Sequence, residues 1–117
     1  MSRSLRNFVS LENKKITWAA AANSQSVQFT TTVSTMGGGV ALQGTSTYLP
    51  SSLAINNNTT VPVFVSVGFG SATAATTDYE IAVGMKEVID IGQADFVAII
   101  PESTTTGSVY LGRGLGN

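Results

Sequence analysis

Apolar side chains recur at every second position in several short segments of the chain. The alternation runs through residues 27–34 and again through residues 61–69, where Pro62 stands near the start. A period of two places successive side chains on opposite faces and is typical of a β-strand with one buried face. Pro62 lacks a backbone N–H, so it fits the start or the edge of a strand. Further strands are predicted at residues 79–83, 88–91, 96–100 and 109–111.

Turn-forming residues separate these segments at 36–39, 56–58, 92–95 and 104–107 and at Gly84. Strands that recur about every 8–12 residues are typical of an all-β sandwich or barrel. The segment 96–100 is apolar on both faces, which predicts a central strand, and no window has a convincing helical period. The prediction is therefore an all-β fold: an antiparallel β-sandwich, jelly-roll-like, with an extended N-terminal segment.

The length and the composition fit one domain with an unusually uncharged surface. The chain has 117 residues, of which we assign 1–15 to an N-terminal arm and 16–117 to a single β-sandwich domain. Only 11% of the residues are charged, against about 25% in an average protein, and none occurs between Lys15 and Asp78. Hydroxyl and amide groups lose water more cheaply than charges do. This favours packing against other protein over the alternative, an uncharged monomeric β-domain.

Two missing residue types exclude many kinds of chemistry. The sequence contains no Cys and no His, which excludes disulfides, thiolate zinc sites and Ser-His or Cys-His catalysis. The net charge of −1 gives no sign of general nucleic-acid affinity. No stretch approaches the ~20 apolar residues of a membrane helix, and the basic N-terminus lacks the apolar region of a secretory signal. We therefore expect no enzyme activity, no cofactor, and no direct contact with nucleic acid or membrane.

Three motifs resemble functional sites but lack essential parts of them. Residues 36–40 are glycine-rich without the Lys-Ser/Thr pair or the helix of a phosphate-binding loop, which favours a flexible hairpin or an arm hinge. Residues 112–116 have spaced glycines without a following helix, which favours a close backbone approach by a terminal strand, or a frayed tail. Asp90 and Asp95 flank a turn, where a weak Ca²⁺ site is the alternative to solvated turn acids.

A succession of short strands and glycine turns extends over residues 53–117. It comprises the segments 55–58, 61–68, 81–84, 87–92, 96–100 and 107–114. This succession resembles the β-sandwich modules of small tailed-bacteriophage virion proteins of the head-decoration (capsid cement) type. The N-terminal part of the chain departs from that module.

The resemblance implies a structural virion protein that decorates and stabilises a bacteriophage capsid by packing across neighbouring shell subunits. Its partner would be the major capsid protein or another virion protein. It would be made in the host cytoplasm and reside on the capsid surface. We expect a homo-oligomer, with a trimer at a local three-fold favoured, because several modest contacts then act together.

Five residues near the N-terminus are the candidate partner-binding residues. Arg3, Arg6, Lys14 and Lys15 would dock on an acidic shell surface, the alternative being a solvated terminus. Trp18 follows this basic segment and either anchors it to the partner or lies in the core.

Other functions stay open on the sequence alone. A carbohydrate- or receptor-binding β-sandwich on the virion surface would have exposed aromatic side chains beside Asp or Asn turns. A tail or head–tail joining subunit would differ from a decoration protein in its ring copy number. An enzyme ranks last, because the sequence offers no nucleophile–base pair.

Overall fold

The computed structural model describes residues 8–36 and 45–116. Every regular element in these ranges is a β-strand, so they contain no helix that could cross a membrane. The strands are β1 (Val9–Ala21), β2 (Gln25–Gln28), β3 (Val33–Met36), β4 (Thr45–Tyr48), β5 (Ser52–Asn58), β6 (Val63–Gly68), β7 (Tyr79–Ile81), β8 (Lys86–Asp90), β9 (Phe96–Pro101) and β10 (Thr105–Leu115).

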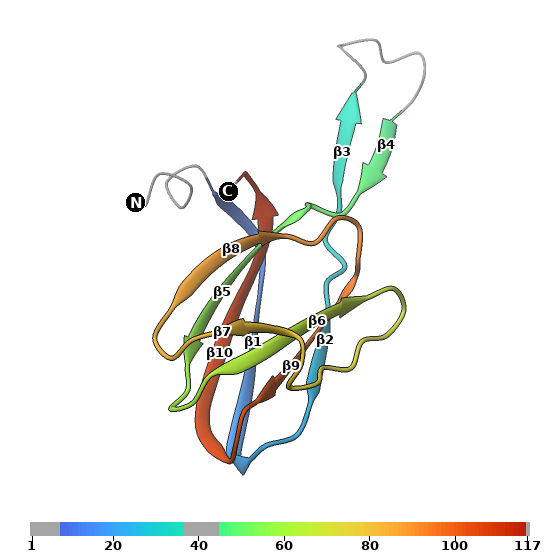
Figure 1. Ribbon diagram of the computed structural model, residues 1–117. Coiled ribbons are helices and arrows are strands. Elements are labelled where there is room, and N and C mark those ends of the chain that lie inside the picture. Colours follow the sequence, from blue (N-terminus) through green and yellow to red (C-terminus); the bar gives the residue numbers. More distant parts are fainter. Residues whose placement is uncertain (1–7, 37–44, 117) are drawn as a thin grey trace.

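Eight of these strands form two four-stranded antiparallel sheets, which make up the body of the protein (Figure 1). The first sheet has the order β1-β10-β5-β8 and the second has the order β2-β9-β6-β7. The pairing is nested, because β1 pairs with β10, β2 with β9, β5 with β8 and β6 with β7. If β3 and β4 are left aside, the chain changes sheet at every connection except the one from β6 to β7.

The core lies between the inner faces of the two sheets. Along β1, Ile16 and Trp18 are buried while Lys15, Thr17 and Ala19 are exposed, as the alternation of a strand requires. Each fully buried aliphatic side chain contributes about 1.5–3 kcal/mol relative to an exposed one. The remaining core residues of the first sheet are Leu53, Ile55, Val109 and Leu111, and the second sheet contributes Val63, Val65, Ile81, Val97 and Ile99.

Most of the predicted strands are present, although their ends differ. Residues 96–101 form β9, which lies between β2 and β6, so the prediction of a central strand is confirmed. The strand β6 begins directly after Pro62, which has no N–H to donate. The single strand expected at residues 27–34 is wrong, because β2 and β3 are separate. The N–H groups of Thr30 and Thr31 between them bind a carboxylate instead of a neighbouring strand.

The turn expected at residues 56–58 is also wrong, because these residues belong to β5. The side chain of Asn57 is fully buried. Its Nδ2 donates to the carbonyl oxygen of Ile81 at 3.0 Å, and its Oδ1 accepts from the N–H of Thr59 at 2.9 Å. The amide thus satisfies backbone groups of the neighbouring loops, and a residue that is typical of turns is stable inside a strand.

The first sheet takes in part of the predicted N-terminal arm. Residues 9–15 form the first half of β1 and pair with β10, starting at Val9 opposite Leu115. Residues 1–7 lie outside the described residues. The division of the chain into an arm and one domain otherwise stays a prediction.

The outer faces of the two sheets differ in how much of their surface is exposed to solvent. Ala98 in β9 is fully buried although its neighbours Val97 and Ile99 point into the core, so other residues lie over it on the outer face. Ala74, in the loop between β6 and β7, is buried too, and its N–H donates to Ser24 Oγ at 3.0 Å. This loop therefore packs against the chain just before β2. The outer face of the first sheet carries exposed polar side chains.

Candidate functional site

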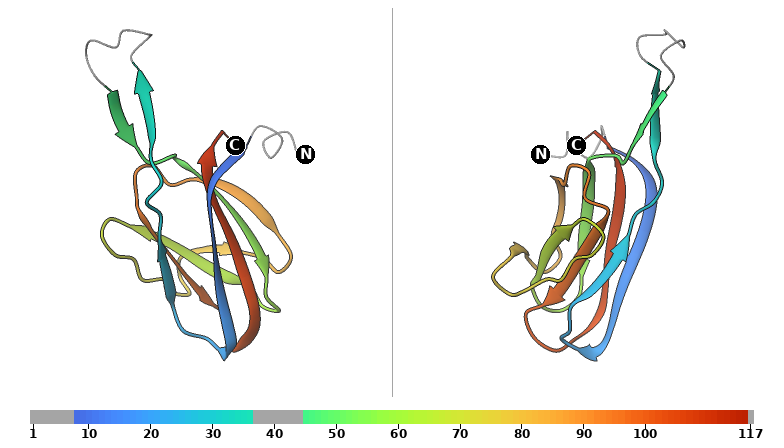
Figure 2. Two further views of the ribbon diagram at one scale, coloured as in Figure 1. Left: turned by 180° about the vertical axis from the view of Figure 1, so that it is seen from behind. Right: turned by 90° about the vertical axis from the view of Figure 1, so that its right-hand side faces the viewer.

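The β3–β4 hairpin projects from one end of the body (Figures 1 and 2). Among the described strands, β3 and β4 pair only with each other, from Val33 opposite Tyr48 to Met36 opposite Thr45. A two-stranded hairpin on its own is at best marginally stable in water, because it buries little apolar surface. All four residues in β4 and two of the four in β3 are Ser, Thr or Tyr with hydroxyl groups, so these strands have little apolar surface to bury against each other.

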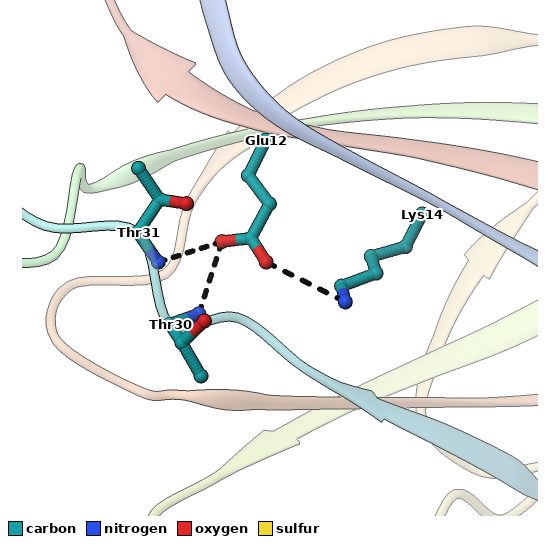
Figure 3. Close-up of polar contacts among 4 residues, drawn as sticks. All are labelled: Glu12, Lys14, Thr30 and Thr31. Atoms are coloured by element: carbon teal, nitrogen blue, oxygen red, sulfur yellow. Dashed lines mark hydrogen bonds and ion pairs between the residues drawn. The ribbon is translucent and has the colours of Figure 1, made fainter.

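Glu12 of β1 holds the segment that leads into the hairpin (Figure 3). Its Oε1 accepts hydrogen bonds from the N–H of Thr30 at 2.9 Å and from the N–H of Thr31 at 2.8 Å. Its Oε2 lies 3.5 Å from the Nζ of Lys14. A β-bulge between Ser10 and Glu12 shifts the register of β1 at this point, and bulges commonly re-aim a side chain. The carboxylate thus accepts the two hydrogen bonds that the carbonyl groups of a neighbouring strand would otherwise accept.

The surroundings of Glu12 favour its ionised form. Burial alone would raise the pKa of this carboxyl, but the N–H groups of Thr31 and Thr30 and the nearby Lys14 ammonium outweigh burial, so the pKa lies below its usual value. Hydrogen bonds to a charged acceptor are roughly twice as strong as neutral ones. Glu12 therefore holds the base of the hairpin most firmly when it is charged.

Arg113 of β10 binds the loops on the returning side of the hairpin. Its side chain is fully buried, and its guanidinium donates to the carbonyl oxygen of Pro50, to that of Ala94 at 2.6 Å and to that of Gly92 at 2.8 Å. The Cζ atom also lies 5.8 Å from the centroid of the Phe29 ring. No carboxylate within the described residues forms an ion pair with it. Carbonyl dipoles and the aromatic ring therefore compensate the buried charge.

Gln93 adds a second contact on the same side. Its Nε2 donates to the carbonyl oxygen of Leu49 at 2.7 Å, and its Oε1 accepts from the N–H of Leu49 at 2.8 Å. Leu49 directly follows β4, so the bonds mimic a strand partner for the last residue of the hairpin stem. The body thus anchors the base of the hairpin through Glu12 on the outgoing segment and through Gln93 and Arg113 on the returning one.

A row of polar side chains crosses the outer face of the first sheet. Lys15, Tyr110, Asn56 and Lys86 lie directly opposite one another in β1, β10, β5 and β8. Side chains in such a row point to the same face and are about 5 Å from their neighbours. Tyr110 is 43% exposed, and the Nζ of Lys15 lies 5.9 Å from its ring centroid. The row therefore has an ammonium group at each end, with an aromatic ring and an amide between them.

A depression with a volume of about 340 Å³ lies beside this row. Ala54 and Gly112, which are paired in β5 and β10, provide a floor with almost no side chain. Ser10 and Asn13 form one wall, where Ser10 Oγ donates to Asn13 Oδ1 at 2.7 Å. A Cβ atom at position 112 would lie 2.9 Å from Ser10 Oγ, so a larger residue there would displace the Ser10 hydroxyl from its present position.

The structure separates the five predicted partner-binding residues. Arg3 and Arg6 lie outside the described residues. Lys14 forms the ion pair with Glu12, whereas Lys15 lies on the outer face of the first sheet. Trp18 is only 1% exposed, and its Nε1 donates to the carbonyl oxygen of Asn23 at 2.8 Å. Its indole ring thus lies in the core and not on a surface that a partner would meet.

The other sequence motifs have structural explanations where the structure describes them. Gly114 allows β1 to approach, because a Cβ atom there would overlap the carbonyl oxygen of Val9, so the predicted close backbone approach is confirmed. Asp90 Oδ1 accepts from the N–H of Gly92 at 2.8 Å, and Asp95 Oδ1 accepts from the N–H of Gly70 at 2.8 Å. No three acidic side chains in the described ranges gather as metal ligands. Residues 37–40 of the glycine-rich motif lie outside these ranges.

No local sequence pattern marks Glu12, Gln93 or Arg113 as anchors of the hairpin base. The available signal was the position of Arg113 between two glycines in a strand, since glycines on both sides leave room for close packing. No protein-family model matches the sequence, and a search of curated proteins finds no relative. Function is therefore inferred from the geometry of this chain.

Proposed function

We propose that the protein is a structural virion protein that decorates a bacteriophage capsid and stabilises it by packing across neighbouring shell subunits. The partner is the major capsid protein or another virion protein, and the role involves no catalysis. The chain associates with itself, in the simplest arrangement as a trimer, and resides on the capsid surface.

The anchored hairpin is the observation that carries this proposal. The body devotes Glu12, Gln93 and Arg113 to the base of a hairpin that it does not cover. A hairpin without apolar cover gains stability by packing on another surface. An anchored base keeps it pointing in one direction, which reduces the entropy that binding would cost. A decoration protein needs such an element to reach a neighbouring subunit.

The absence of charge around the hairpin supports a protein partner. Residues 16–77 include the whole hairpin and contain no charged residue. Charged side chains are depleted at the centres of protein interfaces because they are costly to desolvate. Phe69 at the end of β6 is 75% exposed and offers a further apolar contact.

The nested strand pairing supports the assignment of the body as a jelly roll. A jelly roll consists of eight strands in two sheets with Greek-key connections. The orders β1-β10-β5-β8 and β2-β9-β6-β7 are those of a long antiparallel hairpin rolled up on itself. Jelly rolls occur in viral capsid proteins and also in lectins, so the fold is compatible with a virion role but does not by itself decide function.

Replacing the hairpin tests the proposal directly. Residues 34–47 are replaced by an Asn-Gly turn, and the variant is compared with the intact chain by native mass spectrometry. Both are then sedimented with genome-free heads of the phage that encodes the protein. We expect the intact chain to oligomerise and to co-sediment, and the variant to stay folded but to do neither. Tyr110→Ala, which leaves the hairpin intact, is the matched control. Equal sedimentation of all three proteins would contradict the proposal.

The docking role of the basic residues needs a different experiment. Deletion of residues 1–15 would remove the first half of β1 and disturb its pairing with β10. The substitutions Arg3→Gln, Arg6→Gln and Lys15→Gln remove charge without removing the strand. If these residues dock on an acidic shell surface, the triple variant binds heads more weakly, and the difference shrinks as salt is added. Unchanged binding at low salt would exclude this docking role.

A further inference from the structure

The depression on the outer face of the first sheet is a second surface with its own chemistry. It lies on β1, β10 and β5 and reaches Lys86 at the start of β8. The hairpin anchors Glu12 and Arg113 contact other elements and do not line it. Its volume of about 340 Å³ falls at the lower end of the range of roughly 300–1,000 Å³ typical of small-molecule sites.

The shape of the depression suits a flat ring. Tyr110 lines the depression together with Gly112 and Ala54, which have no side chain or only a methyl group, and Tyr110 is 43% exposed, so part of its ring is accessible. Aromatic rings pack well against apolar faces of this size, and Tyr also offers a hydroxyl group. Asn13 and Asn56 place amide groups on opposite sides of the floor, where they can donate to and accept from hydroxyl groups.

The charge of the face selects among ring-shaped ligands. Lys15 and Lys86 lie in the outer strands of the sheet, about 14 Å apart across three strand spacings. Glu87 points to the opposite face, where its Oε1 accepts from the hydroxyl of Tyr79 at 2.6 Å. Asp90, on the same face as Lys86, lies four residues further along β8, a distance of about 13 Å. The face is thus locally positive in a chain whose net charge is −1.

We propose that this depression binds an acidic saccharide, with the sugar ring against Tyr110, its hydroxyl groups bonded to Asn13 and Asn56, and its carboxylate near Lys86, which lines the depression. Lys15, at the other end of the row, adds positive charge beside the lining. A neutral sugar would leave the two ammonium groups unused. A flexible polyanion without rings would not pack against the aromatic ring of Tyr110. This activity does not use the hairpin, the element proposed to contact the shell, although Lys15 at the edge of the same face is also a candidate for shell docking.

Binding of tetragalacturonic acid to the full-length protein tests the proposal by isothermal titration calorimetry. Maltotetraose serves as the neutral sugar and pentaglutamate as the polyanion without rings. We expect the acidic saccharide to bind at least about tenfold more tightly than either comparison ligand. Equal affinity for pentaglutamate would reduce the site to a general anion surface and overturn the proposal, as would no detectable binding at millimolar concentration.

Four substitutions locate the site. Tyr110→Ala removes the ring on which the sugar packs and is expected to weaken saccharide binding about tenfold. Phe69 is an exposed aromatic residue at the end of the other sheet, and Phe69→Ala is expected to leave saccharide binding unchanged. Lys86→Gln is expected to weaken binding about fivefold, and Lys86→Arg to retain it. All three positions are exposed, so we expect the folded state to persist, and circular dichroism verifies it. Equal loss in Tyr110→Ala and Phe69→Ala would place the ligand elsewhere. We expect Tyr110→Ala to lose saccharide binding but still to bind phage heads. The test of the saccharide site is thus distinct from the test of the capsid role.

Discussion

The body and the hairpin share antiparallel pairing but differ in what stabilises them. In the body, both sheets bury apolar side chains against each other, and the buried polar groups have partners, as Asn57 illustrates. In the hairpin, the strands pair only with each other among the described residues, and side chains of the body bind the chain at its base. Backbone pairing therefore sets the shape of a hairpin, whereas burial determines whether it is stable alone.

The largest effect is expected where body and hairpin meet, at Arg113. Arg113→Met leaves the carbonyl oxygens of Pro50, Gly92 and Ala94 without their donor in a buried site. We expect a loss of about 4 kcal/mol in the free energy of unfolding, measured by urea denaturation. Arg113→Lys keeps the charge but cannot reach all three oxygens, so its free energy of unfolding should lie between those of Arg113→Met and the wild type. If Arg113→Met were as stable as the wild type, the carbonyl contacts would contribute little to stability.

A smaller loss is expected within the body, at Asn57. Asn57→Ala removes the donor to Ile81 and the acceptor for Thr59 and leaves a cavity. The expected cost is about 3 kcal/mol in the free energy of unfolding. Asn58→Ala, the exposed neighbour, is the control and should cost less than about 0.5 kcal/mol. A cost at Asn57 as small as that at Asn58 would contradict the view that the amide organises these loops.

Glu12 adds a pH-dependent contribution at the base of the hairpin. Its pKa is lowered in the folded protein, so its contribution is complete above the unfolded pKa of about 4.3 and disappears as the pH falls through the lower folded pKa. Glu12→Gln is therefore expected to cost about 1 kcal/mol at pH 7 and progressively less below pH ~4. Urea midpoints across this pH range measure the difference. A difference that is constant between pH 7 and pH 3 would show that the charge of Glu12 is irrelevant.

The smallest effect on stability is expected for the hairpin itself. Replacement of residues 34–47 by Asn-Gly should change the free energy of unfolding by less than about 0.5 kcal/mol, because the removed strands bury little of the core. Thermal unfolding of the purified variant provides the measurement. A loss of several kcal/mol would mean that the hairpin stabilises the body, and the contrast between the two regions would then be wrong.

The alternation of apolar residues predicted β6, which buries Val63 and Val65 on one face, and the continuous apolar run predicted β9, which is buried on both faces. The sequence pattern failed for β5, where Asn57 imitates a turn residue while its amide bonds to loops that are distant in sequence. It also failed between β2 and β3, since a carboxylate on another strand accepts the N–H groups there. The candidate sites were harder to predict, because each combines residues from three or more segments that are far apart in the sequence.

The sequence alone determined the all-β class, the presence of a long uncharged segment and the lack of thiol and imidazole chemistry, because period, charge and composition are properties of the chain itself. The tertiary structure decided that Arg113 is buried beneath the hairpin, that Trp18 lies in the core, and that Lys15 and Lys86 share one face with Tyr110. Those outcomes depend on which strands become neighbours, and strand order follows from the burial of the whole core and not from any local pattern.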